Sequence, residues 1–164
     1  PQLKMFSPKP GDPADYVAVS PDLGSVTRAR NFAARLGCPL AIVDKRRQKA
    51  NVCEVMNIIG DVKGKKIVLV DDMIDTAGTF CNAAQAIMDA GAKEIIGCAT
   101  HAVLSGPAVE RLKESPIEEL ILLDTVPLPP EKMLPMFTIL PVAPLFAEAI
   151  ERVYEDKPVS PMFV

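Results

Sequence analysis

Lys66-Ile-Val-Leu-Val-Asp-Asp-Met-Ile-Asp-Thr-Ala-Gly-Thr79 is the stretch that decides the fold of this 164-residue chain. Its aliphatic run from Ile67 to Val70 is bounded by Gly64 and by two acids, which predicts a buried strand of a parallel sheet. A helical pattern follows from about Phe80 to Ala90, and Gly91 suits the left-handed residue that ends many helices. A buried strand, a short loop and a helix in this order form the repeating unit of an α/β fold.

The junction between this strand and this helix suits a sugar phosphate. In open α/β sheets, ligands bind beyond the carboxyl ends of the strands, which is where we expect Asp71 and Asp72 to stand. A carboxylate accepts hydrogen bonds from two neighbouring hydroxyl groups, so this pair would suit a ribose. The start of the helix offers unpaired N–H groups and a positive dipole end to a phosphate. The loop before it adds hydroxyl donors and a glycine that allows close approach, in the order Asp75, Thr76, Ala77, Gly78 and Thr79.

Each part of this junction also has a simpler interpretation. Two acids after a strand are often only a solvated loop. The segment from Thr76 to Thr79 can be a plain helix cap, with Asp75 or Thr76 as the N-cap residue. Taken together, and in this order, the acids and the loop favour the sugar-phosphate interpretation.

The rest of the chain alternates between strand and helix patterns. Strands are predicted at residues 16–19, 40–43, 55–59, 94–99, 119–123 and 137–140, and helices at residues 26–36, 107–114 and 145–154. Residues 45–51 are polar and without periodicity, which predicts a loop, and the proline-rich residues 126–135 are predicted to be a connection. The alternation predicts an α/β domain with a mostly parallel sheet, flanking helices and right-handed crossovers.

Composition indicates an ordinary soluble globular protein and argues against several functions. The net charge of −3 argues against a nucleic-acid partner, and no apolar run is long enough to span a membrane. The four cysteines lack CxxC spacing and the chain has one histidine, so we expect reduced, buried thiols in a cytoplasmic protein rather than a zinc site. The chain has neither a Walker A motif nor a GxGxxG fingerprint, so any nucleotide is held in another way.

Two further groups of charged residues follow predicted strands. The basic cluster of Lys45, Arg46, Arg47 and Lys49 comes after the second strand, at the ligand end of the sheet. It is either a solvated charged loop or a mobile loop that closes over phosphates and expels water. Asp22 lies in the turn after the first strand and is either a turn acid or a ligand for Mg²⁺, a hard cation that prefers oxygen.

The motif Val68-Leu-Val-Asp-Asp-Met-Ile-Asp-Thr-Ala-Gly-Thr79 resembles the phosphoribosyl pyrophosphate (PRPP) signature of type I phosphoribosyltransferases. Within these relatives, the chain is more similar to the ribose-phosphate pyrophosphokinase (PRPP synthetase) family. Further segments resemble that family's pyrophosphate-side loop, its mobile catalytic loop and two parts nearer the carboxyl terminus. They are Val19-Ser-Pro-Asp-Leu-Gly24 with Arg28-Ala-Arg30, Asp44-Lys-Arg-Arg47 with Glu54-Val-Met-Asn57, Ala99-Thr-His-Ala-Val-Leu-Ser-Gly-Pro107, and Val159-Ser160.

The resemblance implies a type I phosphoribosyltransferase-like fold and a ribose-phosphate diphosphokinase activity. Such an enzyme transfers the diphosphoryl group of Mg–ATP to the 1-hydroxyl of ribose 5-phosphate, which gives PRPP and AMP. The resemblance assigns ribose 5-phosphate or PRPP to Asp71, Asp72 and the loop at residues 75–79. It assigns stabilisation of the transferring group to Lys45 and Arg47.

The resemblance also implies a metal site, a regulatory site and an assembly. Asp22 would be a ligand for Mg²⁺, and Ser160 would belong to a regulatory phosphate or ADP site. Members of the family assemble as homo-oligomers, so a hexamer of dimers is expected. Ser25 stands where the family often has glycine, and Ala102 replaces a common glycine after His101, which we expect to be structural rather than catalytic.

Members of this family have two similar α/β domains, and the chain resembles the carboxyl-terminal one. We therefore expect residues 1–15 to be an interdomain segment and residues 16–164 the domain itself. Much of the ATP site would lie in the amino-terminal half, so the chain alone should not complete the reaction. Two alternatives remain: a phosphoribosyltransferase that uses PRPP, although no hood for a nucleobase is evident, and a non-catalytic regulatory or binding relative, although the acids and the glycine of the loop are present.

Overall fold

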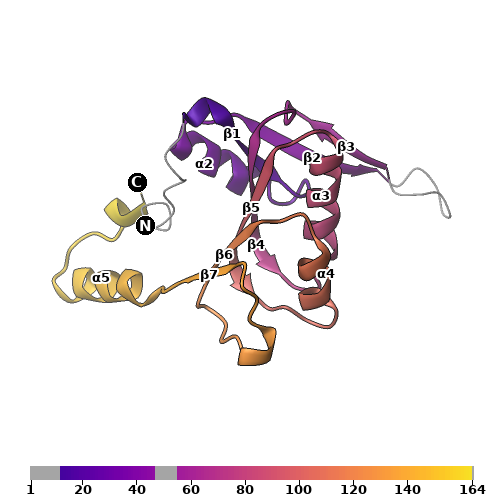
Figure 1. Ribbon diagram of the computed structural model, residues 1–164. Coiled ribbons are helices and arrows are strands. Elements are labelled where there is room, and N and C mark those ends of the chain that lie inside the picture. The colour runs from indigo at the N-terminus through magenta and orange to yellow at the C-terminus, as the bar shows by residue number, and fades with distance from the viewer. Residues whose placement is uncertain (1–11, 47–54, 164) are drawn as a thin grey trace.

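The computed structural model describes residues 12–46 and 55–163 (Figure 1). Its strands form one seven-stranded sheet in the order β3-β2-β1-β4-β5-β6-β7. Neighbouring strands are parallel except for β2 and β3 at one edge, which are antiparallel. The strands are β1 (Tyr16–Ser20), β2 (Leu40–Arg46), β3 (Val55–Ile59), β4 (Lys66–Ile74), β5 (Glu94–Ala102), β6 (Glu119–Leu123) and β7 (Phe137–Leu140). The helices are α2 (Val26–Leu36), α3 (Gly78–Asp89), α4 (Ala108–Glu114) and α5 (Ala143–Tyr154), with short 3-10 turns η1 (Pro13–Asp15), η2 (Pro130–Lys132) and η3 (Ser160–Phe163).

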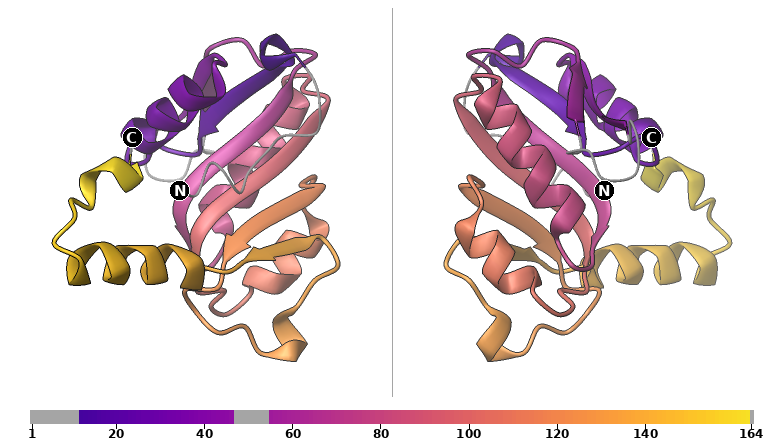
Figure 2. Two further views of the ribbon diagram at one scale, coloured as in Figure 1. Left: turned by 90° about the vertical axis from the view of Figure 1, so that its left-hand side faces the viewer. Right: turned by 90° about the vertical axis from the view of Figure 1, so that its right-hand side faces the viewer.

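Helices cover both faces of the sheet. Figure 2 shows α2 on one face and α3 and α4 on the other. Successive side chains of a strand point to opposite faces, so β4 has to be apolar on both. Ile67 and Leu69 join the core beneath α3 and α4, whereas Val68 and Val70 join the core beneath α2. The predicted α/β class with a mostly parallel sheet is confirmed.

Several predicted element boundaries are confirmed, and others are extended. α2, β3, β6 and β7 match their predicted ranges, and α4 begins one residue later than predicted. β4 and β5 run further than predicted, to Ile74 and Ala102, because these two residues still pair with each other. The predicted loop at residues 45–51 is wrong at its start, since Lys45 and Arg46 belong to β2 and pair with β3. A segment that lacks the apolar pattern can still form a strand when a neighbouring strand pairs with it.

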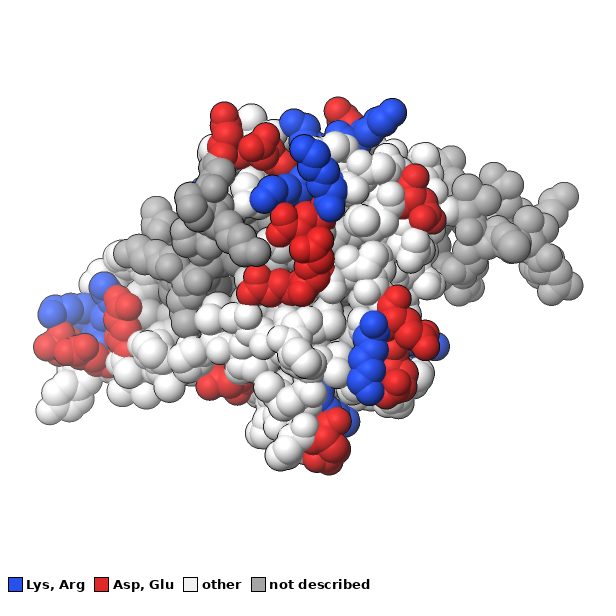
Figure 3. Space-filling model, viewed as in Figure 1, with Lys and Arg blue, Asp and Glu red and all other residues white. Residues whose placement is uncertain are grey.

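The helix α5 projects away from the sheet (Figures 1 and 2). It begins at Ala143, two residues earlier than predicted, and none of its residues is buried. Its apolar side chains are largely exposed, and Tyr154 reaches 89%. An ion pair between Arg152 and Glu148 lies on this helix, and acidic and basic side chains are neighbours there in Figure 3. Among the described residues, α5 therefore has an ion pair along its own surface but no buried side chain.

Three of the four cysteines lie in the described residues and are free thiols. Cys38, Cys81 and Cys98 are half-buried, and Cys53 lies outside the described residues. Burial raises the pKa of the Cys81 thiol to about 11, while Ser115 and Arg111 act in the other direction. Within the part of the chain that the structure describes, no helix is long and apolar enough to cross a membrane.

Candidate functional site

A pocket of about 380 Å³ opens where β1 and β4 end. One side consists of the turn after β1 and the first turn of α2, with Asp22, Gly24, Ser25 and Arg28. The other side is the continuous segment of residues 71–80, which leads from β4 into α3. The structure thus brings the predicted ribose acids, the predicted phosphate loop and the predicted metal ligand to one cavity. The parallel pairing of β1 with β4 explains this, since it sets the carboxyl ends of both strands at the same edge.

The sequence had indicated that the acid pair stands beyond the end of its strand. The structure instead places both acids inside β4. β4 continues to Ile74, and the backbone of Asp71 pairs with Ala99 of β5. Both carboxylates are half-buried, and both still line the pocket. β1 stops at Ser20, so the longer β4 extends past its neighbour and exposes the acids on the side of the pocket.

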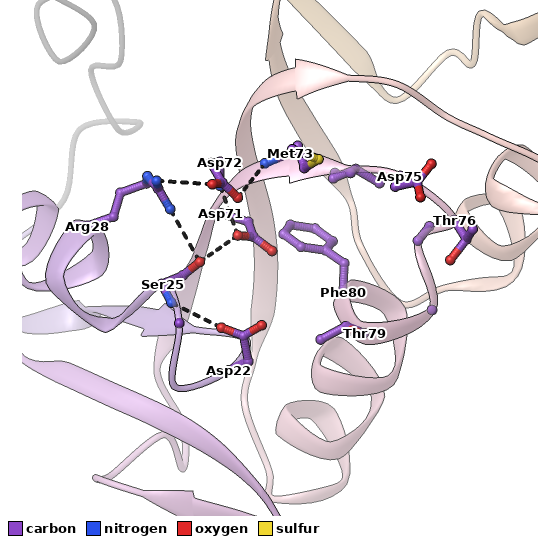
Figure 4. A pocket seen from close by; sticks show the side chains of 14 residues that line it. Asp22, Ser25, Arg28, Asp71, Asp72, Met73, Asp75, Thr76, Thr79 and Phe80 are labelled. Carbon is purple, nitrogen blue, oxygen red and sulfur yellow. Dashed lines mark hydrogen bonds and ion pairs between the residues drawn. The ribbon is translucent and has the colours of Figure 1, made fainter.

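A hydrogen-bond network joins the start of α2 to the acids (Figure 4). The Ser25 hydroxyl donates to Asp71 Oδ1 at 2.6 Å, and its backbone N–H donates to Asp22 Oδ1 at 3.0 Å. The Arg28 guanidinium pairs with Asp72 Oδ2 at 3.2 Å and also donates to the Ser25 hydroxyl at 3.3 Å. The network fixes both carboxylates relative to Asp22 before any ligand arrives.

The roles of Ser25 and Arg28 were not predicted. Ser25 was noted as a departure from the usual glycine, yet its side chain is 5% exposed and holds Asp71. Arg28 was noted as part of a resembling segment without a role. The signal for both was their spacing, because residues three apart on a helix lie on the same side. Which acids they would meet depended on the pairing of β1 with β4.

Burial and the neighbouring groups shift the pKa values of the two carboxyl groups in opposite directions. Burial raises the pKa of Asp71, and the nearby Asp72 and Asp22 act in the same direction, although the Ser25 hydroxyl opposes them. Burial also acts to raise the pKa of Asp72, but the hydrogen bond with Asp71 and the charge of Arg28 outweigh it, so this pKa is lowered. Two acids whose pKa values are pushed apart are a feature of functional sites.

The loop before α3 has the shape of an anion site. α3 begins at Gly78, two residues earlier than predicted, and its N-cap residue is Ala77 rather than Asp75 or Thr76. Ala77 adopts a left-handed conformation with φ of 60°, and no side chain caps the helix. A left-handed N-cap lets the chain turn sharply from the strand into the helix. The first N–H groups of α3 have no acceptor inside the helix and are available to a ligand.

Phe80 anchors this loop to the sheet. It is the third residue of α3, is 2% exposed, and packs where Gly97 of β5 leaves room. A Cβ atom on Gly97 would lie 2.9 Å from Phe80 Cε1. Figure 4 shows the Phe80 ring between the acids and the loop. Phe80 therefore packs the start of α3 against β5, between the two ends of the pocket.

The chemistry of the pocket suits a magnesium ion that is shared with a ligand. Asp22 and Asp71 point toward a common space in Figure 4, and Asp22 disfavours ionisation of Asp71. A divalent cation would relieve this repulsion. Among the described residues, no three side chains of the metal-binding types converge to hold a metal by themselves. Mg²⁺ commonly binds through one or two carboxylates and completes its coordination with water and phosphate oxygens.

Other predicted site residues lie outside this pocket or outside the described residues. The backbone of Lys45 belongs to β2, and Arg47 lies outside the described residues. Ser160 is exposed at the start of η3 and does not line the pocket. His101 Nδ1 lies 2.9 Å from the Thr125 hydroxyl, which donates to the Thr100 carbonyl oxygen at 2.8 Å. The structural role of His101 stays a prediction.

Comparisons with known proteins point in one direction. The family model described as "Phosphoribosyl synthetase-associated domain" matches residues 47–164. The chain is 66% identical over 149 residues to the ribose-phosphate pyrophosphokinase of Caldanaerobacter subterraneus subsp. tengcongensis, which covers 91% of the chain and 47% of that protein. The chain thus spans about half the length of this relative.

Solved structures show the same fold. The crystal structure of phosphoribosylpyrophosphate synthetase from Mycobacterium smegmatis superimposes with a TM-score of 0.80 at 44% identity, over 87% of this chain and 46% of that one. Orotate phosphoribosyltransferase from Aeropyrum pernix superimposes with a TM-score of 0.54 at 20% identity, over 65% of this chain and 58% of that one. The second likeness concerns the fold alone, and it confirms the predicted type I phosphoribosyltransferase-like architecture.

Proposed function

The chain belongs to the phosphoribosyl synthetase-associated domain family, and from that premise we propose that it is the ribose 5-phosphate-binding part of a ribose-phosphate diphosphokinase. One observation carries the proposal. The acid pair and the phosphate-binding loop face the same pocket of about 380 Å³, which can take a small sugar phosphate. The names of the relatives support the reaction class, since they are pyrophosphokinases.

The pocket suggests how the ligand is held. Asp71 and Asp72 accept hydrogen bonds from the neighbouring hydroxyl groups of the ribose. The 5-phosphate binds the N–H groups of the loop at residues 75–79, with further donors from Thr76 and Thr79. Arg28 keeps Asp72 charged, and Ser25 keeps Asp71 oriented, so both acceptors are arranged in advance.

The reaction that follows from this binding mode needs no covalent enzyme intermediate. The 1-hydroxyl oxygen of ribose 5-phosphate attacks the β-phosphorus of ATP. The bond between that phosphorus and the oxygen bridging to the α-phosphate breaks, and this oxygen leaves with AMP. The diphosphoryl group ends on the 1-oxygen, which gives up its proton, and the product is PRPP. Positioning and charge supply the catalysis in such transfers.

Cations are the second requirement of this chemistry. When Mg²⁺ is bound, it neutralises phosphate charge, and Asp22 is the residue that we propose to hold it. Lys45 and Arg47 are proposed to stabilise the transferring group, as the family resemblance implies. Lys45 follows the buried Asp44 near the carboxyl end of β2, beside β1, so its backbone lies at the carboxyl edge of the sheet.

Three further parts of the proposal rest on the family resemblance. Ser160 would contribute to a regulatory phosphate or ADP site, and its exposure at the start of η3 supports access to a ligand. The protein would assemble as a homo-oligomer, a hexamer of dimers. It would act in the cytoplasm, where ribose 5-phosphate and ATP are available.

Calorimetric titration of the chain with ribose 5-phosphate tests the binding site. We expect Asp72→Asn to raise Kd about tenfold or more, because a hydrogen bond to a charged acceptor contributes about 1.5–3 kcal/mol. Asp89→Asn removes the same charge from the far end of α3, where Asp89 contacts Gln85, and is the matched control. Equal affinities of native protein and Asp72→Asn would refute the assignment of the acid pair.

A chimera tests the reaction. This chain replaces the segment that it matches in the Caldanaerobacter enzyme, and AMP release is measured with ATP, with and without ribose 5-phosphate. Release that depends on ribose 5-phosphate and needs no nucleobase supports the diphosphokinase. A folded chimera that binds ribose 5-phosphate but releases no AMP, beside an active parent enzyme, would favour a binding or regulatory relative.

A further inference from the structure

We propose that Arg111 is a positioning residue that holds the loop at residues 75–79 in its phosphate-binding shape. This inference rests on the proposed function, which supplies the phosphate ligand. Arg111 lies on α4, and its Nη1 donates to the carbonyl oxygen of Thr76 at 2.9 Å. Thr76 immediately precedes the left-handed Ala77, so the contact falls on the sharpest part of the loop.

The contact completes a series along the loop. The carbonyl oxygens of Ile74 and Asp75 accept backbone N–H groups from residues 103–105 at 2.9–3.1 Å. The next carbonyl oxygen, that of Thr76, accepts from Arg111. Residues 103–105 and Arg111 of α4 therefore engage three consecutive carbonyl groups between the end of β4 and the turn into α3. The bonds to the first two carbonyl groups come from backbone N–H groups and do not depend on side-chain identity, whereas the bond to the third requires Arg111.

Peptide geometry links this contact to anion binding. In a trans peptide the C=O and the N–H point in opposite directions, and the described residues contain no cis peptide bond. A guanidinium that holds the Thr76 carbonyl therefore aims the N–H of Ala77 to the opposite side. Arg111 does not line the pocket, whereas Thr76 and Ala77 do. The N–H of Ala77 consequently points toward the side from which a phosphate would approach.

Gly78 provides the room for this arrangement. A Cβ atom at this position would lie 3.3 Å from Arg111 Nη1, closer than carbon and nitrogen normally approach. An alanine at this position would therefore require the guanidinium to shift by a few tenths of an ångström.

No described neighbour neutralises the charge of Arg111. Within the described part of the chain, no carboxylate lies within ion-pair distance of it, and the adjacent Glu110 pairs instead with Lys113 at 2.8 Å. Arg111 donates its hydrogen bond to Thr76 O, just before α3 begins, so its positive charge adds to the positive end of the α3 dipole. An anion in the pocket benefits from both.

A pair of variants on one helix tests the role of Arg111. Arg111→Met removes the donor and the charge but keeps an unbranched side chain, and Lys113→Met removes an equal charge from a surface ion pair. By calorimetry with ribose 5-phosphate, we expect Kd to rise about tenfold or more in Arg111→Met, and to stay within about twofold of native in Lys113→Met. Arg111→Lys can still donate to Thr76 and should recover part of the loss.

A second measurement separates this inference from the proposed function. Inorganic phosphate should shift the amide NMR signals of residues 77–79 in the native protein and in Lys113→Met, but much less in Arg111→Met. Equal ligand affinity of Arg111→Met and native protein would overturn the inference, as would an equal loss in Lys113→Met or no recovery in Arg111→Lys.

If the native protein fails to bind ribose 5-phosphate while phosphate still shifts these amides, the proposed function fails and the NMR comparison decides the role of Arg111. If phosphate shifts none of these signals in the native protein, both proposals fail.

Discussion

Replacing Gly97 with alanine should destabilise the protein and disturb the phosphate loop together. Gly97 lies in β5, between two side chains of the core. A Cβ atom there would come 2.6 Å from Leu120 Cδ1 and 2.9 Å from Phe80 Cε1. Non-bonded carbon atoms settle at about 3.5–4.0 Å, so both neighbours must move. β5 pairs on both sides, with β4 and β6, and cannot shift to make space.

Two opposing effects set the size of the change. Forcing an extra methyl group into a close-packed core costs about 1–3 kcal/mol. The smaller conformational freedom of alanine in the unfolded chain returns about 0.4–1 kcal/mol. The steric term is the larger, and we expect a net loss of about 1–2 kcal/mol, or a fall of about 2–8 °C in Tm for a protein of this size.

Urea denaturation followed by circular dichroism measures this change, and a double-mutant cycle tests its cause. Leu120→Ala alone should destabilise the native protein by about 2–5 kcal/mol, but clearly less in the Gly97→Ala background, because it removes the clashing Cδ1 atom. Additive effects, or a Gly97→Ala protein as stable as native, would refute the steric argument. The Kd for ribose 5-phosphate should also rise, since a displaced Phe80 moves the start of α3.

Two further predictions concern the acids and pH. Ser25→Ala removes the hydroxyl group that opposes the rise in the pKa of Asp71. As the pH falls, the variant should therefore lose its affinity for ribose 5-phosphate at a higher pH than the native protein does. Calorimetry across about pH 5–8 measures this, and an unchanged pH profile would contradict it. Because the pKa of Asp71 is raised, the folded protein loses stability as the pH rises from the ordinary aspartate pKa of about 4 through the raised pKa. Asp71→Asn should therefore unfold at higher urea concentration than native protein at pH 7 but not below about pH 4, and equal stability at both pH values would count against the burial argument.

Local patterns were sufficient to predict most of the fold. The aliphatic run before the acids, the glycine that follows α3 and the alternation of strands with helices are local signals, and each produced its element. Where a boundary was missed, the cause was a partner elsewhere in the chain. β2 extends through Lys45 and Arg46 because β3 pairs with them, and β4 extends past the acids because β5 does.

The site was predictable in its parts but not in its arrangement. Asp71, Asp72 and the loop at residues 75–79 could be recognised because acids and small residues between a strand and a helix are a local feature. Ser25 and Arg28 contact those acids across 46 and 44 residues of sequence, and Arg111 contacts Thr76 across 35. No spacing rule reaches so far, since these contacts depend on which strands become neighbours.

The sequence by itself determined that a strand, two acids, a loop and a helix follow one another, because backbone propensity and hydrophobic pattern act over a few residues. The tertiary structure alone decided what surrounds them. The parallel register of β1 with β4 set Asp22 and Ser25 against the acids, and the parallel register of β4 with β5 set α4 behind the loop. The physical reason is that sheet pairing joins segments by backbone hydrogen bonds, which are common to all residues and leave little trace in any one segment.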